Sequence, residues 1–362
     1  MFGLKSNVRQ TWKKTWQHQL TEYITQVVWS PDGEILAACS AAGEILLQTF
    51  GDNQVLPPVY LAATGAPIDQ LAFSADGRYL ASGDQAGQVR VWERQGQQFI
   101  LLITHDRSGC WIEQLRWHPT EPLLAFNVKH TVEVLQITTK SLVAKLDFEN
   151  SSVLCIEWHP TNGLLMAGGY QSIRVWDSYD WQTEPIIVPI ASASLKIACS
   201  PDGKYLASGN LDRTITILEW AEANPNPWVM SGFPGKISHL VWSSLLPTAA
   251  DALLASASVA GIVVWERNAV FGWKEQLLEN HTQAVEAIAF QPQRQQLASA
   301  GLDGAVNIWQ NAKTLACTLT DASEAFSCLN WHPWQQSLAA GGSQGEIFVW
   351  SQINSGRGFG KS

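Results

Sequence analysis

The chain has 362 residues, of which 46% are hydrophobic and 15% charged, and its formal net charge is −9. An acidic balance disfavours general attraction to DNA or RNA phosphates, which depends on clustered Lys and Arg. No stretch of the sequence approaches the run of about 18 apolar residues that a transmembrane helix needs, so we predict a soluble protein without membrane attachment.

The N-terminal segment, MFGLKSNVRQTWKKTWQHQ, has basic residues but neither the apolar core nor the cleavage site of a signal peptide. We therefore expect a cytoplasmic protein. Within this segment, residues 11–20 contain Trp12 and Trp16 and have the composition of a β-strand.

A pattern of three short strands then recurs along the chain. Its best-formed copy is 281–309, where apolar alternation in 284–290 is followed by a Pro-containing turn, a second strand at 297–301, a Gly turn and a third strand at 305–309. A meander this small needs neighbours to cover its apolar faces. Its third-strand ends recur about 41–47 residues apart, at Gln48, Trp92, Leu135, Trp176, Leu218, Trp265, Trp309 and Trp350.

A repeat of this length with four strands per unit is typical of a β-propeller, in which each unit is one blade. We count eight blades, with seven as the alternative, because the first and third copies are degenerate. The chain begins with a spare strand and its last repeat lacks one. We predict that residues 11–20 pair beside 346–350 and close the ring, that 1–354 form a single all-β domain, and that the Gly-rich residues 355–362 are disordered.

The turns WSPDG at Trp29, FSADG at Phe73 and CSPDG at Cys199 are accompanied by LASG runs and by strands that end in VW or VWD. These residues resemble the WD-repeat β-propeller family, and the resemblance covers nearly the whole chain. It implies a non-catalytic scaffold for protein–protein interaction. Its partners would dock on the upper face, where the loops between the second and third strands and those entering the first strand emerge.

The same resemblance implies a structural role for four residues of the best-formed copy, His281, Ser299, Asp303 and Trp309. In the family such residues form a buried network that stabilises the blade. A hydrolase would also need an exposed nucleophile and an oxyanion hole, and the sequence indicates neither, so we predict no enzymatic activity. Other copies lack members of the set, and there we expect stability from apolar packing.

We predict no metal and no cofactor. The triplets WHP place His118, His159 and His332 in equivalent turns of different blades, too far apart to share an ion. The six cysteines lie singly and are expected to be buried free thiols.

The candidate binding residues lie at the upper ends of the blades. Trp111 and Tyr23 stand where the chain enters a first strand, and the loop before Trp111 contains Arg107. Aromatic and Arg side chains are typical of binding hot spots, and the cations favour a partner with an acidic surface. The full candidate set is Tyr23, Arg107, Trp111, Tyr170, Arg213 and Lys236.

Two other functions remain as alternatives. One is a nucleoprotein or RNA-associated adaptor, which the net charge disfavours. The other is an enzyme or ligand-binding propeller that uses the central channel, which we disfavour because the inner strands are mostly apolar. The sequence does not identify the partner, the pathway or the oligomeric state.

Overall fold

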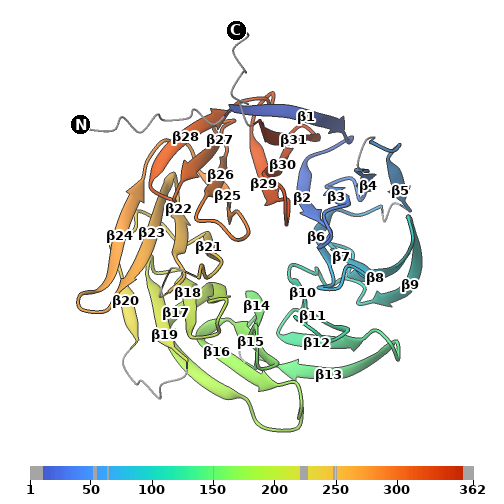
Figure 1. The fold of residues 1–362 in the computed structure, drawn as a ribbon. Coiled ribbons are helices and arrows are strands. Elements are labelled where there is room, and N and C mark those ends of the chain that lie inside the picture. The colour runs from blue at the N-terminus through green and yellow to red at the C-terminus, as the bar shows by residue number, and fades with distance from the viewer. Residues whose placement is uncertain are drawn as a thin grey trace, which may run out of the picture.

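The computed structural model describes residues 11–51, 55–62, 65–149, 151–220, 227–247, 249 and 251–353. These residues form 31 β-strands and no helix, arranged as a ring of antiparallel sheets (Figure 1). A helix long and apolar enough to cross a membrane is therefore absent from this part of the chain. The all-β propeller predicted from the repeat is confirmed.

Each blade contains four strands, with the first strand of the repeat innermost in the ring, and they follow chain order except in the last blade, whose outermost strand is β1. The first four blades consist of β2 (Ile24–Trp29), β3 (Ile35–Ser40), β4 (Ile45–Thr49) and β5 (Val59–Leu61); β6 (Ile68–Phe73), β7 (Tyr79–Asp84), β8 (Gln88–Gln95) and β9 (Gln98–Asp106); β10 (Leu115–Trp117), β11 (Leu123–Val128), β12 (Thr131–Gln136) and β13 (Ser141–Asp147); β14 (Cys155–Trp158), β15 (Leu164–Gly168), β16 (Tyr170–Asp177) and β17 (Ile186–Cys199).

The remaining blades consist of the end of β17 with β18 (Tyr205–Asn210), β19 (Ile215–Glu219) and β20 (Trp228–Met230); β21 (His239–Trp242), β22 (Leu254–Ser258), β23 (Gly261–Asn268) and β24 (Gly272–Leu278); β25 (Val285–Phe290), β26 (Leu297–Gly301), β27 (Val306–Gln310) and β28 (Thr314–Leu319); β29 (Phe326–Trp331), β30 (Ser337–Gly342), β31 (Glu346–Ile353) and β1 (Thr11–Gln19).

The number of blades depends on β17, a strand of 14 residues. Its first half pairs with β16, with Pro189 opposite Ser172, and its second half pairs with β18, with Ile197 opposite Ser208. The fourth and fifth blades therefore merge into one seven-stranded sheet beside six four-stranded sheets. When the shared strand is counted in both blades, the ring has eight.

The ring is closed by strand pairing between the two ends of the chain. β1 runs antiparallel to β31, with Thr11 opposite Ile353 and Gln19 opposite Glu346. Figure 1 shows β1 along the outside of the last blade. The predicted pairing of residues 11–20 is confirmed, whereas the predicted tail at 355–362 lies outside the described residues.

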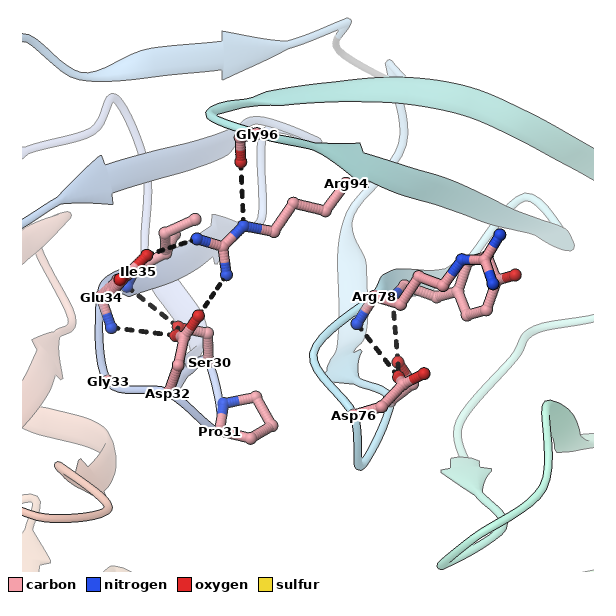
Figure 2. Close-up of polar contacts among 12 residues, drawn as sticks. Ser30, Pro31, Asp32, Gly33, Glu34, Ile35, Asp76, Arg78, Arg94 and Gly96 are labelled. Carbon is pink, nitrogen blue, oxygen red and sulfur yellow. Dashed lines mark hydrogen bonds and ion pairs between the residues drawn. The ribbon is translucent and has the colours of Figure 1, made fainter.

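The SPDG turn between the first two strands explains why this sequence recurs. In the first blade, Asp32 Oδ1 accepts a hydrogen bond from Glu34 N at 3.0 Å, and Ser30 Oγ accepts one from Ile35 N at 2.9 Å (Figure 2). Arg94 of the second blade ties the turn to its neighbour through Asp32 at 2.5 Å and Glu34 at 2.6 Å. The turn therefore satisfies its own backbone and also links two blades.

Tryptophans of the inner strands also connect neighbouring blades. The indole Nε1 of Trp117 donates to the carbonyl of Ala72 at 2.9 Å, and that of Trp158 donates to the carbonyl of Arg116 at 3.1 Å. Trp331 makes the equivalent bond to Ala289 at 2.9 Å. Each of these rings donates its indole N–H to the inner strand of the preceding blade, so the inner strands are linked by polar contacts as well as by apolar packing.

Candidate protein-binding face

The structure brings His281, Ser299, Asp303 and Trp309 together inside the seventh blade. His281 Nε2 lies 2.8 Å from Ser299 Oγ, and His281 Nδ1 lies 3.0 Å from Asp303 Oδ2. The indole of Trp309 donates to Ser299 Oγ at 2.9 Å, and Ser299 is fully buried. The hydroxyl is out of reach of any substrate, so the geometry suits a structural network in which each polar group has a partner.

The expectation that the other blades depend on apolar packing alone is wrong. In the fifth blade, Ser208 Oγ lies 2.6 Å from Ser194 Oγ and donates to Asn210 Oδ1 at 2.7 Å, and Asn210 reaches Thr216 Oγ1 at 3.0 Å. This blade lacks the His but keeps the Asp, as Asp212, which accepts a hydrogen bond from Thr214 Oγ1 at 2.7 Å. Ser194, Asn210 and Thr216 complete a different network around Ser208, which the family pattern does not predict.

The histidines of the WHP turns connect blades. His159 Nε2 lies 3.0 Å from the carbonyl of Gly203, and His332 Nε2 lies 3.0 Å from the carbonyl of Gly33, across the seam of the ring. Gly33 has a φ of +77°, and a Cβ on it would collide with the His332 ring. The SPDG turn therefore requires Gly here both for its backbone conformation and for the close approach of His332. In the described part of the chain, no three His, Cys, Asp or Glu form a group that could hold a metal.

Arg107, which we predicted as a binding residue, is held by a buried carboxylate. Its Nε donates to Glu133 Oε2 at 2.8 Å, and His105 Nε2 lies 3.1 Å from the same oxygen. The Glu133 side chain is only 1% exposed. Burial alone would raise the pKa of Glu133, but hydrogen bonds from His105 and Arg107 outweigh it and hold that pKa below its ordinary value. The charge of Arg107 therefore neutralises the buried Glu133 carboxylate, and little positive charge remains to attract a partner.

The predicted aromatic residues Trp111 and Tyr23 remain accessible. Trp111 is 48% exposed and donates its indole N–H to the carboxylate of Asp69 on the neighbouring blade. Tyr23 is 37% exposed, and burial of the rest of its ring raises its pKa. Both remain candidate binding residues, although the hydrogen bond to Asp69 holds the Trp111 ring against the neighbouring blade.

A larger apolar surface follows the turns between the second and third strands. Tyr170, Leu211, Val259 and Leu302 occupy this turn in the fourth to seventh blades and are between 41% and 61% exposed. We call these four residues the apolar arc. Backbone bonds from Leu211 N to Ala193 O, at 3.0 Å, and from Leu302 N to Ala284 O, at 2.9 Å, place these turns beside the loops that enter the inner strands. The other blades carry Ala41, Gln85, Lys129 and Ser343 at this turn.

Of the apolar arc, only Tyr170 was predicted from the sequence. The signal was present, since the residue that follows each second strand can be compared between repeats. It was missed because isolated exposed aliphatic residues are ordinary on protein surfaces. Only their occurrence on four consecutive blades at one end of the ring makes them a continuous feature.

The inner strands are mostly apolar, as expected, but those of the third to sixth blades each contain one charged or ionisable residue. Arg116, Glu157, Lys196 and His239 occupy their innermost strands. Arg116 Nε lies 3.9 Å from Glu157 Oε2, and its Nη1 donates to Gln70 at 3.3 Å. Burial lowers the pKa of His239 to about 4, so this imidazole is neutral at pH 7.

Replacing Glu157 by Gln is expected to stabilise the protein above pH 7. Although 32% of the side chain is accessible, desolvation raises the pKa of Glu157 to about 7, against an ordinary 4.5. Between these values the folded protein binds more protons than the unfolded chain, so stability falls as pH rises toward 7. In the Glu157→Gln variant this pH dependence should disappear, whereas the control Glu113→Gln should keep it. Urea unfolding at pH 5 and pH 8 measures the change in the free energy of unfolding with pH. The same change in wild type and Glu157→Gln would contradict the prediction.

Comparison with known proteins agrees with the geometry. The WD domain, G-beta repeat model matches residues 10–47, 59–93, 192–218 and 272–310, and the anaphase-promoting complex subunit 4 WD40 domain model matches 90–161. Periodic tryptophan protein 2 of Arabidopsis thaliana is 25% identical over 69% of this chain and 27% of its own length. Nucleoporin Nup37 of Mus musculus is 20% identical over 67% of this chain and 70% of its own.

The intraflagellar transport protein 80 homolog of Rattus norvegicus is 23% identical over 46% of this chain, and the match covers 21% of that protein. The plant protein and the intraflagellar transport protein are therefore much longer than the region they share with this chain. The shared region is the propeller itself, with its repeated turns and strand ends. On the repeat matches, the sheet topology and the blade-seven network together, this chain belongs to the WD-repeat β-propeller family.

Proposed function

We propose that this protein is a non-catalytic scaffold that holds one or more protein partners on its upper face. The observation that carries the proposal is the apolar arc, in which four large side chains stand exposed on consecutive blades. Large apolar side chains that are exposed near one another on one face are typical of protein interaction sites. The blades beneath are rigidly linked, so the arc is presented without any ordering of the backbone.

The partner surface that fits this side of the ring is acidic. Arg213 and Lys236 are exposed beside the arc, and neither side chain has an ion pair or hydrogen bond with any residue that the structure describes. Unpaired cations on an acidic protein attract carboxylates and increase the rate of association. This proposal moves the acidic contact from Arg107, which is paired with Glu133, to the fifth and sixth blades.

Two further observations support a scaffold role. A nucleoporin and an intraflagellar transport protein are among the relatives, which favours a part in larger assemblies. All six cysteines are free thiols, which suits a reducing compartment and supports a cytoplasmic location.

The test replaces Leu211 and Val259 together by Ser. Proteins that co-purify with the wild type from its native cells are identified by mass spectrometry. We expect their recovered amount to be at least tenfold lower with this variant. The matched control replaces Ile100 and Leu101 by Ser. These residues are 47% and 50% exposed on an outer strand, and the control variant should retain the co-purifying proteins. Equal recovery with both variants would show that the arc is not the binding surface.

A further inference from the structure

A hollow of about 450 Å³ lies at the sixth blade, beside the apolar arc. Its walls come from the loop that follows β20, the turn between β22 and β23, and the strands β23 and β24. Most of the lining is apolar, including Phe233, Pro234, Val259 and Leu277. A hollow of this volume has the size of sites that bury a compact ligand or the side chains of a peptide.

The hollow is preformed. Phe233 is 8% exposed and packs against Trp265, with ring centroids 6.1 Å apart. Ser258 Oγ donates to the carbonyl of Gly235 at 2.8 Å and accepts from its N–H at 3.1 Å, which ties the loop to the turn. His281, at the edge, is committed to Ser299 and Asp303. A ligand would therefore meet walls that need little rearrangement, which favours affinity.

Val259 is held in an unusual backbone conformation. Its φ is +53°, which a β-branched residue rarely adopts. The carbonyl of Val259 accepts a hydrogen bond from Val285 N at 2.9 Å, and the side chain is 52% exposed at the rim of the hollow. Strained residues of this kind concentrate at binding sites, and here the strained residue presents an apolar side chain to solvent.

Positive charge lies on one side of this hollow. Lys236 follows Pro234 and Gly235 in the wall loop and is exposed without a partner among the described residues. The lining also contains one acid, Glu279, which follows β24 directly.

We infer that the hollow seats an aliphatic or aromatic side chain of an acidic partner segment, in which a neighbouring carboxylate pairs with the exposed Lys236. This rests on the proposed scaffold function and specifies its ligand. The apolar walls supply the favourable burial, at about 25 cal/mol for each Å² of apolar surface removed from water. Lys236 attracts a carboxylate of the segment, whereas Glu279 repels one, so the two charges favour the orientation that brings the carboxylates to Lys236.

The experiment selects binders from a random 12-residue peptide library displayed on phage, against the purified full-length protein. Enriched peptides should combine an aliphatic or aromatic residue with at least two Asp or Glu. Their Kd, measured by fluorescence anisotropy, should rise at least tenfold for Lys236→Glu and for Val259→Asn. Asn adopts positive φ readily, so Val259→Asn removes the apolar rim without destabilising the turn. Lys129→Glu, a charge reversal on the same face, should leave Kd unchanged.

Changing the apolar residue of an enriched peptide to Ser should weaken binding as much as Val259→Asn does. The inference is overturned if the enriched peptides lack acidic residues, if no peptide is enriched, or if Kd changes less than twofold in both variants. The inference would also be overturned if Trp111→Ala, and neither Lys236→Glu nor Val259→Asn, abolished peptide binding. That result would still place the binding surface on the upper face. The scaffold proposal itself depends on the separate co-purification experiment.

Discussion

Removal of residues 1–20 is expected to leave a protein that is largely unfolded at 37 °C. The truncation takes away β1, the outer strand of the last blade, and exposes the edge of β31. It also removes Trp12, which packs edge-on against Trp331 at 5.6 Å, Trp16, which packs against Phe50 at 5.6 Å, and the buried Leu20. Buried side chains of this size contribute about 2–5 kcal/mol each, and whole domains are stable by only about 5–15 kcal/mol.

Thermal unfolding followed by circular dichroism measures this effect, with aggregation monitored by light scattering. Lys13→Ala is the control, because Lys13 lies on the same strand with its side chain exposed and should melt like the wild type. A truncated protein with the same melting temperature as the intact chain would show that pairing with β1 does not hold the ring closed.

Arg107→Ala is expected to lower the free energy of unfolding by about 2–4 kcal/mol, because it leaves the buried Glu133 carboxylate with His105 alone. The effect should depend on pH. The pKa of Glu133 lies below its ordinary 4.5 in the folded protein, so its contribution is present above pH 4.5 and is lost as pH falls through the folded value. The difference between wild type and variant should therefore shrink in acid.

Urea unfolding at pH 4 and pH 7 measures the difference, and Arg107→Ala combined with Glu133→Gln should recover part of the loss by removing the buried charge. Arg213→Ala is the matched control, since that exposed Arg has no side-chain partner among the described residues and should change stability by less than about 0.5 kcal/mol. A loss of the same size from both Arg variants would contradict the importance of the buried pair. For the same reason, Arg107→Ala is unsuitable as a test of partner binding.

Most of the fold was predictable because its signals are local. The alternation in 284–290, the turn at 30–33 and the strand ends at Trp92 and Trp309 each report a short-range preference of the backbone, and their repetition identifies the architecture. Even ring closure followed from counting strands, since a spare strand at one end matches a missing strand at the other. The merger of two blades through β17 was not predictable, because 186–199 reads as two strands and a connection.

The candidate site was less predictable, because exposure and charge compensation depend on residues distant in sequence. Arg107 looked like a free cation until the fold placed Glu133 beneath it. Trp111 looked free until Asp69 of the neighbouring blade accepted its indole N–H. The charges of the inner strands were overlooked because single polar residues in apolar strands gain meaning only when neighbouring blades bring them together.

The sequence by itself therefore determined the WD-repeat propeller, the closing strand and the four members of the blade-seven network. Each of these depends on spacing along the chain, which the sequence states directly. The tertiary structure alone decided which upper-face residues are free to bind, by pairing Arg107 with Glu133 and by aligning Tyr170, Leu211, Val259 and Leu302 on consecutive blades. It did so because the packing of one blade against the next, rather than any local preference, sets which side chains are neutralised, buried or left exposed.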